Sequence, residues 1–167
     1  MNPIQPKQLF RICLCCGLFC LQIMFGLLSN ADADDTIVTV EDLMIVTSDG
    51  RNLKFTIEIA TTMDERRKGL MFRQSLAPQS GMLFDYGKTR KVTMWMKNTY
   101  VPLDILFIDE TGVIGSIAHN TVPLSLVPIP SDGIVLGVLE INAGTAETFN
   151  INTGDMVIHH IFKNTVN

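Results

Sequence analysis

Short apolar segments, each followed by a turn signal, run through most of this chain. Between residues 53 and 59, apolar side chains alternate with Lys54, Thr56 and Glu58, which is the period of a strand with one face in water. Similar segments lie at residues 43–47, 81–84, 92–97, 103–108, 113–119, 134–141 and 156–162. The pattern predicts a mainly β fold: a small sandwich-like or barrel-like domain of about seven or eight short strands with one or two short helices.

Two segments carry helix signals. Thr62 followed by Glu65 fits a capping box, so a helix is predicted at residues 63–68 with Gly69 at its end. Thr145 is placed to cap one helical turn at residues 146–150.

Other segments predict turns or a central strand. Residues 86–91 predict a turn, and residues 120–133, which hold three prolines, predict a long surface loop. Residues 103–108 are apolar on both faces apart from Asp104, which predicts a strand in the middle of a sheet.

The amino-terminal segment differs from the rest of the chain. Lys7 and Arg11 precede an apolar run at residues 12–28, and Ala31 and Ala33 form an A-x-A arrangement. A positive start, an apolar middle and small residues at the end predict a signal peptide that is cleaved after Ala33. The alternative is an uncleaved anchor, but this run of 17 residues is shorter than the ~20 that a spanning helix needs.

This start predicts an exported protein, periplasmic in a Gram-negative bacterium and otherwise secreted or membrane-anchored. Residues 1–33 would be the signal peptide, residues 34–42 a polar lead-in, residues 43–162 one β-rich domain and residues 163–167 a tail. Membrane contact would run through residues 12–28, and only if they are retained. All four cysteines lie in that run. Cleavage would therefore exclude thiol catalysis, disulfides and cysteine-ligated zinc.

The mature chain would be acidic but would carry a concentrated basic zone. Removal of Lys7, Arg11 and Asp32 leaves 11 Lys and Arg against 16 Asp and Glu. Eight of the positive residues lie close together in the chain: Arg66, Arg67, Lys68, Arg73, Lys88, Arg90, Lys91 and Lys97. This zone could attract an anionic ligand or membrane headgroups, or it could be a solvated face. Export and the acidic total argue against nucleic acid as a partner.

Four motifs, in this order and spacing, resemble one family. They are GLMFR at residues 69–73, GMLFDY at 81–86, WMKNTYVPLDILFID at 95–109 and VLEINAG at 138–144. Over roughly residues 43–161 the chain resembles the domain-of-unknown-function 192 family, and the third motif is the most specific. The resemblance implies a β-rich sandwich or barrel, and many members carry an export signal. The family has no established activity, so the resemblance implies no chemistry, and it assigns no role to His119.

Two carboxylates interrupt apolar strand faces. By alternation, Asp104 shares a face with Leu106, and Glu140 shares one with Leu136 and Val138. A buried carboxylate is costly without a partner. The candidate partners are backbone amides and the side chains of Arg67, Arg73, Lys97 and Asn98. In one cleft, the two carboxylates could support acid–base chemistry, as in glycosidases. Apart, each would anchor a turn or pair with an arginine.

Trp95 and its neighbours form the other candidate site. An exposed Trp95 beside Lys97 and Asn98 would suit a sugar or an aromatic ligand, whereas a buried Trp95 would only fill the core. The predicted groove would be bordered by the loop at residues 120–133. The predicted ligand-binding residues are Arg67, Arg73, Trp95, Lys97, Asn98 and Asp104.

No metal site and no cofactor are predicted. Five methionines within residues 63–96 could bind Cu(I) or line an apolar groove, but filling the core suits them better. His159 and His160 are neighbours on a predicted strand, so they would point to opposite faces and could not share one metal ion. The sequence contains no nucleotide-binding loop and no hydrolase motif of the common kinds.

Three functional hypotheses follow. The first is a non-enzymatic exported domain that binds a small molecule or an envelope protein near Trp95. The second is a hydrolase of a carbohydrate or an ester that uses Asp104 and Glu140. The third is a purely structural envelope protein whose motif residues hold the fold.

Overall fold

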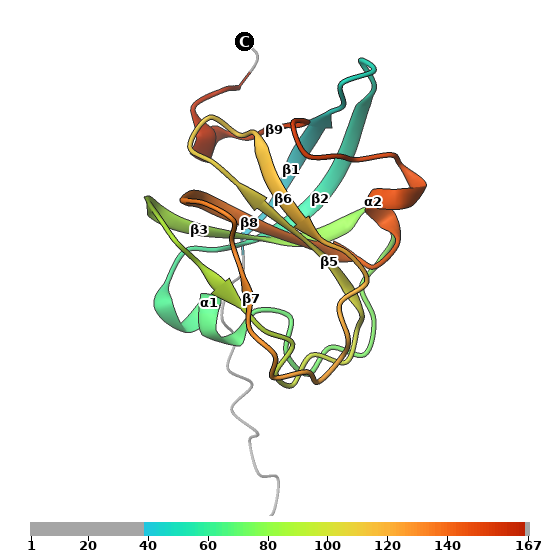
Figure 1. Cartoon of the computed structure of the whole chain (residues 1–167), viewed down its shortest axis with the longest axis vertical. Coiled ribbons are helices and arrows are strands. Elements are labelled where there is room, and N and C mark those ends of the chain that lie inside the picture. Colours follow the sequence, from blue (N-terminus) through green and yellow to red (C-terminus); the bar gives the residue numbers. More distant parts are fainter. Residues whose placement is uncertain (1–38, 166–167) are drawn as a thin grey trace, which may run out of the picture. The chain divides into compact units, whose positions relative to one another are not determined.

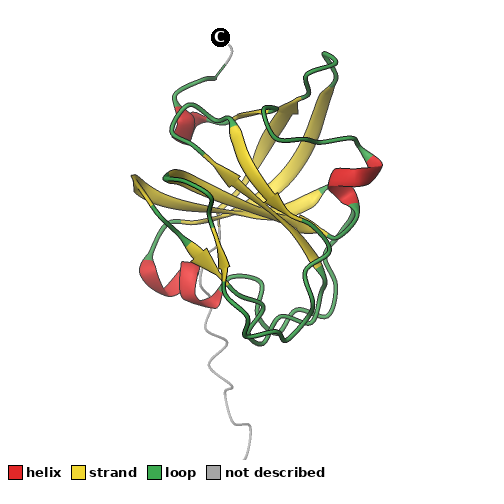
Figure 2. Ribbon diagram, in the orientation of Figure 1, coloured by secondary structure: helices red, strands yellow, loops and turns green. Residues whose placement is uncertain are grey.

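The computed structural model describes residues 39–165, so the predicted signal peptide at residues 1–33 lies outside the described residues. Nine strands and three short helical segments make up the described part (Figure 2). The strands are β1 (Thr39–Val46), β2 (Asn52–Ala60), β3 (Ser80–Arg90), β4 (Thr93–Met94), β5 (Leu103–Ile108), β6 (Ile114–Ala118), β7 (Ile129–Pro130), β8 (Val135–Asn142) and β9 (Met156–Ile158). The helices are α1 (Met63–Lys68), α2 (Thr145–Thr148) and the 3₁₀ helix η1 (His160–Phe162). The mainly β prediction is confirmed.

Seven of these strands form a sheet that curls until its two edges nearly meet (Figure 1). Its order is β6-β5-β8-β3-β2-β1-β9. Among the strands of residues 39–165 only β2 and β3 pair in parallel, and α1 lies in the crossover that a parallel pair requires. The edges touch at an isolated bridge between Val113 and Met156, where the amide of Ile114 donates to the carbonyl of Asp155 over 2.9 Å. The result is a nearly closed barrel. Within residues 39–165, the helices are too short to cross a bilayer.

Alternation along the strands sends side chains into two cores. All six residues of β5 are buried. Leu106 and Ile108 pack into a core shared by the strands of the barrel, and Ile105 and Phe107 pack into a second core outside it. Residues from β4 and its flanking segments, such as Met96, cover the second core. The predicted central position of residues 103–108 is confirmed, because β5 lies between β6 and β8.

The first helix prediction is confirmed and the second needs a correction. The Thr62 side chain accepts from the backbone of Glu65, the Glu65 side chain reaches back, and α1 ends at Gly69 as predicted. In α2, however, Thr145 is the first helical residue and not the cap. Gly144 occupies the cap position without a side-chain bond, and the orphan amide of Ala146 is instead satisfied by a carboxylate from β5.

Strand boundaries also differ from the predictions. β1 begins at Thr39, so part of the predicted lead-in at residues 34–42 belongs to the sheet. β3 continues through the predicted turn at residues 86–91 as far as Arg90, with a shift in its register against β8. Such an irregularity reverses the alternation of facing side chains. Leu136 therefore packs towards the barrel core and does not share the face of Glu140.

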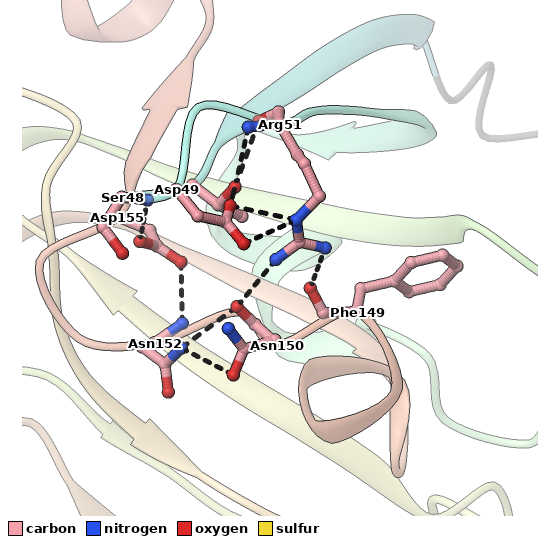
Figure 3. Close-up of polar contacts among 8 residues, drawn as sticks. Ser48, Asp49, Arg51, Phe149, Asn150, Asn152 and Asp155 are labelled. Atoms are coloured by element: carbon pink, nitrogen blue, oxygen red, sulfur yellow. Dashed lines mark hydrogen bonds and ion pairs between the residues drawn. The ribbon is translucent and has the colours of Figure 1, made fainter.

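Hydrogen bonds connect the turn between β1 and β2 to the loop that follows α2 (Figure 3). The buried carboxylate of Asp155 accepts from the amides of Ser48 and Asn152, each over 2.8 Å. Arg51 donates through Nη1 to the carbonyl of Phe149 over 2.7 Å. Charge-assisted bonds to backbone groups are among the stronger hydrogen bonds in proteins. They fix this end of the barrel.

Candidate functional site

A hollow of about 170 Å³ lies between α1, strands β3 and β8, and the segment that begins at β4. Its lining combines cationic side chains of the helix with aromatic and sulfur-containing side chains and one acid. The residues that matter below are Arg66, Arg67, Met71, Tyr86, Trp95 and Glu140. Residues far apart in the chain therefore meet here on the outer face of the barrel.

Glu140 is the acid of this hollow. It pairs with Met82 of β3 on one side and with Ile105 of β5 on the other, so its side chain faces the second core with theirs. The residue is 4% exposed. Among residues 39–165 no hydrogen bond or ion pair is formed by its carboxyl group, and burial raises the pKa of Glu140 to about 8. At neutral pH this side chain is a neutral carboxylic acid that can donate a proton in a hydrogen bond.

Cations and an aromatic ring line the same hollow as this acid. The guanidinium of Arg66 lies 5.3 Å from the centre of the Tyr86 ring and donates to the carbonyl of Asp85 over 2.8 Å. Burial raises the pKa of Tyr86 to about 12, although Arg66 opposes the shift. The Tyr86 hydroxyl therefore stays protonated. Arg67 is mostly exposed and pairs with Asp64 of the same helix over 3.2 Å, which is a weak contact at a wet surface.

Trp95 forms an open wall of the hollow. It is 49% exposed, while its neighbours Met94 and Met96 point into the second core. The ammonium of Lys97 lies 5.3 Å from the centre of the Trp95 ring, within the range of a cation–π contact. Asn98 is half-buried beside this segment with a positive φ of 55°. Trp95 is therefore partly exposed, as the ligand-binding hypothesis requires.

The loop at residues 120–133 packs against this same segment. The amide of Leu124 donates to the carbonyl of Thr99 over 3.1 Å, and the amide of Met96 donates to the carbonyl of Ser125 over 3.1 Å. Within the loop, β7 pairs with β4. The loop thus supports β4 and the segment after it that carries Trp95.

Asp104 lies elsewhere and has a different environment. It pairs with Ile141 across β5 and β8, whereas Glu140 pairs with Ile105. Neighbouring register positions point to opposite faces of a sheet. Asp104 is 0% exposed, and its two oxygens accept from the amides of Asn120 and Ala146, each over 2.9 Å. The two carboxylates do not share a cleft, and among residues 39–165 the partners of Asp104 are backbone amides and no cation.

Of the other predicted residues, Arg67 and Trp95 line the hollow, whereas Lys97, Asn98 and Arg73 are not part of its lining. Lys97 contacts the ring of Trp95, and the side-chain amide of Asn98 donates to Sδ of Met71 over 4.0 Å. Arg73 instead donates through Nη1 and Nη2 to the two carboxylate oxygens of Glu58 on β2. That pairing is the main cause that raises the pKa of Arg73.

Sequence reasoning missed Tyr86 as a site residue. The signal was available, because Met82, Phe84 and Tyr86 alternate along one face of β3. Predicting a turn at residues 86–91 ended the strand too early to use it. Arg66 was noticed only as one charge of the basic zone, since its contact with Tyr86 depends on how α1 packs.

Comparison with known proteins places this geometry in a family. Residues 44–159 match the model of the domain-of-unknown-function 192 family, described as an uncharacterized ACR. A crystal structure from Sinorhizobium meliloti 1021, given as a candidate transcription regulator, is 44% identical with a TM-score of 0.73, covering 74% of this chain and 96% of that one. A protein of unknown function from Novosphingobium aromaticivorans DSM 12444 is 36% identical with a TM-score of 0.72, covering 75% and 89%. No curated protein matches.

Proposed function

Because this chain belongs to the domain-of-unknown-function 192 family, which is uncharacterized, we propose a function from the site alone. The protein is an exported, non-enzymatic binding module of the cell envelope. Its ligand is a small organic anion that sits in the hollow between α1 and Trp95. The negative charge of the ligand lies near the cations of α1. One oxygen of the ligand accepts a hydrogen bond from the protonated carboxyl of Glu140.

One observation carries this proposal: the carboxyl group of Glu140 lines the hollow, is buried enough for its pKa to rise to about 8, and forms no hydrogen bond with residues 39–165. Burying a polar group without a hydrogen bond destabilises a fold, and most buried polar groups are paired. Residues that reduce stability in this way concentrate at functional sites. An anion that accepts from the Glu140 hydroxyl would supply the missing partner. A neutral acid in a hollow that cationic side chains also line favours an anion over a cation, because Arg66 and Arg67 line the same hollow.

The size of the hollow limits the ligand. At about 170 Å³ it is smaller than the roughly 300–1,000 Å³ of sites for drug-sized molecules. It would hold a small carboxylate or phosphate, or one acidic side chain of a partner protein. The exposed face of Trp95 favours a ligand with an apolar or aromatic body.

The hydrolase hypothesis gains no support from this arrangement. Two carboxylates that share glycosidase chemistry face one another across the scissile bond, whereas Asp104 and Glu140 lie on opposite faces of the sheet. Nucleic acid is not part of the proposal either. The predicted mature chain is acidic, with 11 basic against 16 acidic residues, which argues against a nucleic-acid partner.

A ligand screen by thermal unfolding tests the binding site. We expect benzoate or a small phosphate monoester to raise the melting temperature by several degrees at 100-fold excess over Kd, since mass action then contributes about 2.7 kcal/mol. Benzamide, which has the shape of benzoate without its charge, should raise the melting temperature far less.

Glu140→Leu and Trp95→Ala should abolish the benzoate shift, measured from the melting temperature of each ligand-free variant. Arg67→Ala should reduce it, and Arg73→Ala, the matched change outside the hollow, should leave it unchanged.

The pH dependence of binding provides the control for Glu140. In the wild type the benzoate shift should weaken above pH 8, where Glu140 ionises and repels the anion. Glu140→Gln keeps a donor and cannot ionise, so its shift should persist to pH 9. If no anion of the panel stabilises the protein, or if Glu140→Leu responds like the wild type, the site is structural and the third hypothesis gains.

The molecular mass and the cellular location of the expressed chain test the export prediction. We expect the full gene, expressed in a Gram-negative host, to yield a periplasmic chain that begins at Asp34, because the A-x-A arrangement ends at Ala33. Ala31→Arg together with Ala33→Arg should block cleavage and retain the full-length chain. A wild-type chain of full length in the membrane fraction would favour the anchor, and one in the cytoplasm would contradict export.

A further inference from the structure

Two histidines and one glutamate converge where β1 lies beside the segment that follows β9. The prediction that His159 and His160 point to opposite faces of a strand is wrong, because β9 ends at Ile158. His159 keeps an extended backbone, with φ −161° and ψ 152°, but His160 begins η1. The chain turns between them, and the two imidazole rings lie 4.3 Å apart, centre to centre.

Both rings direct a nitrogen at the same atom. Nε2 of His159 lies 3.0 Å from Oε2 of Glu41, and Nε2 of His160 lies 2.8 Å from it. One candidate ligand atom from each residue lies within 4.8 Å of the others. A metal ion held by nitrogen and oxygen at ~2.0–2.2 Å places neighbouring ligand atoms roughly 3 Å apart. The three side chains are thus close to a coordinating arrangement before any ion enters.

One histidine of this cluster is held in place by burial, and the other is open to solvent. The side chain of His159 is 2% exposed, which fixes its ring, whereas that of His160 is 60% exposed. The cluster opens on a hollow of about 500 Å³ at the edge of β1. Asp42 and Lys54 also line this hollow, so a second carboxylate offsets the charge of the lysine. Three protein ligands would leave a coordination position open to water.

A purely structural reading also exists: Glu41 accepts two N–H groups and fastens the end of the chain to β1. Under that reading, and within residues 39–165, the buried Nδ1 of His159 has no partner. A metal ion on Nε2 would move the ring proton to this Nδ1. Ligating histidines normally donate that proton to an acceptor, and loss of such support costs ~10–100-fold in affinity. The expected site is therefore of moderate affinity.

We propose that Glu41, His159 and His160 form a binding site for a divalent first-row transition-metal ion, with two imidazole nitrogens and one carboxylate oxygen as ligands. This donor set suits Zn²⁺, Ni²⁺ and Cu²⁺, with Cu²⁺ bound most tightly. The site is separate from the hollow around Glu140. The site joins β1 to the segment at His159 and His160 and exists only in the folded protein. The ion would therefore also stabilise the folded protein by mass action.

Titration of the full chain with Cu²⁺ and Zn²⁺ tests this site, after alkylation of the cysteines, all four of which lie within residues 12–28. We expect one ion per chain with a Kd on the order of micromolar for Zn²⁺, and a Cu²⁺ EPR spectrum with hyperfine splitting from two nitrogens. His160→Ala and Glu41→Gln should each weaken Zn²⁺ binding at least tenfold. His119→Ala removes an exposed imidazole elsewhere and should leave the titration unchanged.

The variants also separate ligand loss from unfolding. His160 is exposed, so His160→Ala should unfold in urea near the wild-type midpoint without metal, and only the wild type and His119→Ala should gain stability from Zn²⁺. Absence of binding up to millimolar Zn²⁺, or binding that His160→Ala and Glu41→Gln both retain at wild-type strength, would overturn the proposal.

Discussion

Replacing Asp104 with alanine is expected to lower the free energy of unfolding by about 3–5 kcal/mol. The two oxygens of this buried side chain satisfy the amides of Asn120 and Ala146. Hydrogen bonds to a charged group contribute roughly 1.5–3 kcal/mol each, and a buried amide left without an acceptor carries its full desolvation cost. The loss would be measured by urea denaturation at pH 7.

Asparagine at the same position gives a graded comparison. Asp104→Asn keeps one acceptor but turns an NH₂ group towards the other amide, so we expect a loss of about 2–3 kcal/mol. Asp132→Ala removes an exposed carboxylate and should change stability by less than about 0.5 kcal/mol. If Asp104→Ala were as mild as Asp132→Ala, the anchoring role of Asp104 would be wrong.

Glu140 is expected to make the protein less stable as the pH rises. The pKa of its carboxyl is about 8 in the folded chain against an ordinary value of 4.5. Between these values the folded state holds one more proton than the unfolded state, so stability falls as pH rises. The slope is about 1.4 kcal/mol per pH unit, and the full loss across this window is roughly 5 kcal/mol. Above pH 8 this contribution levels off.

Glu140→Gln should remove that slope, because glutamine resembles the neutral acid and does not titrate. We expect the variant to match the wild type near pH 5 and to exceed it by about 3–5 kcal/mol at pH 8.5. Urea denaturation at each pH unit from 5 to 9 measures the difference, and the exposed Glu110→Gln serves as the control. An unchanged slope in Glu140→Gln would show that the folded protein binds no extra proton at this carboxyl.

These two acids show how a residue can be found without its role being known. Both stood out in the sequence as carboxylates on apolar strand faces, and both are buried. Whether they met in one cleft depended on the register between β5 and β8. A register is set by long-range pairing, and a shift of one residue exchanges the two faces of a strand. No local pattern contains that information.

Some parts of the site were within reach of sequence reasoning. Trp95 and Arg67 were proposed from residue type and charge, and the structure places both at the hollow with Glu140. Tyr86 was missed because a turn was predicted where β3 continues, and Arg73 was included although it pairs with Glu58. Residue type identifies side chains that can bind, but only packing decides which of them face one another.

By itself the sequence determined the class of fold, the boundaries of α1 and the central place of β5, because alternation and capping act between residues close in the chain. It also marked the family through the motif at residues 95–109. The tertiary structure alone decided that Asp104 and Glu140 face opposite sides of the sheet, that Glu140 and α1 line the same hollow, and that two adjacent histidines meet at Glu41. Each of these depends on contacts between residues distant in sequence, whose geometry exists only once the barrel has closed.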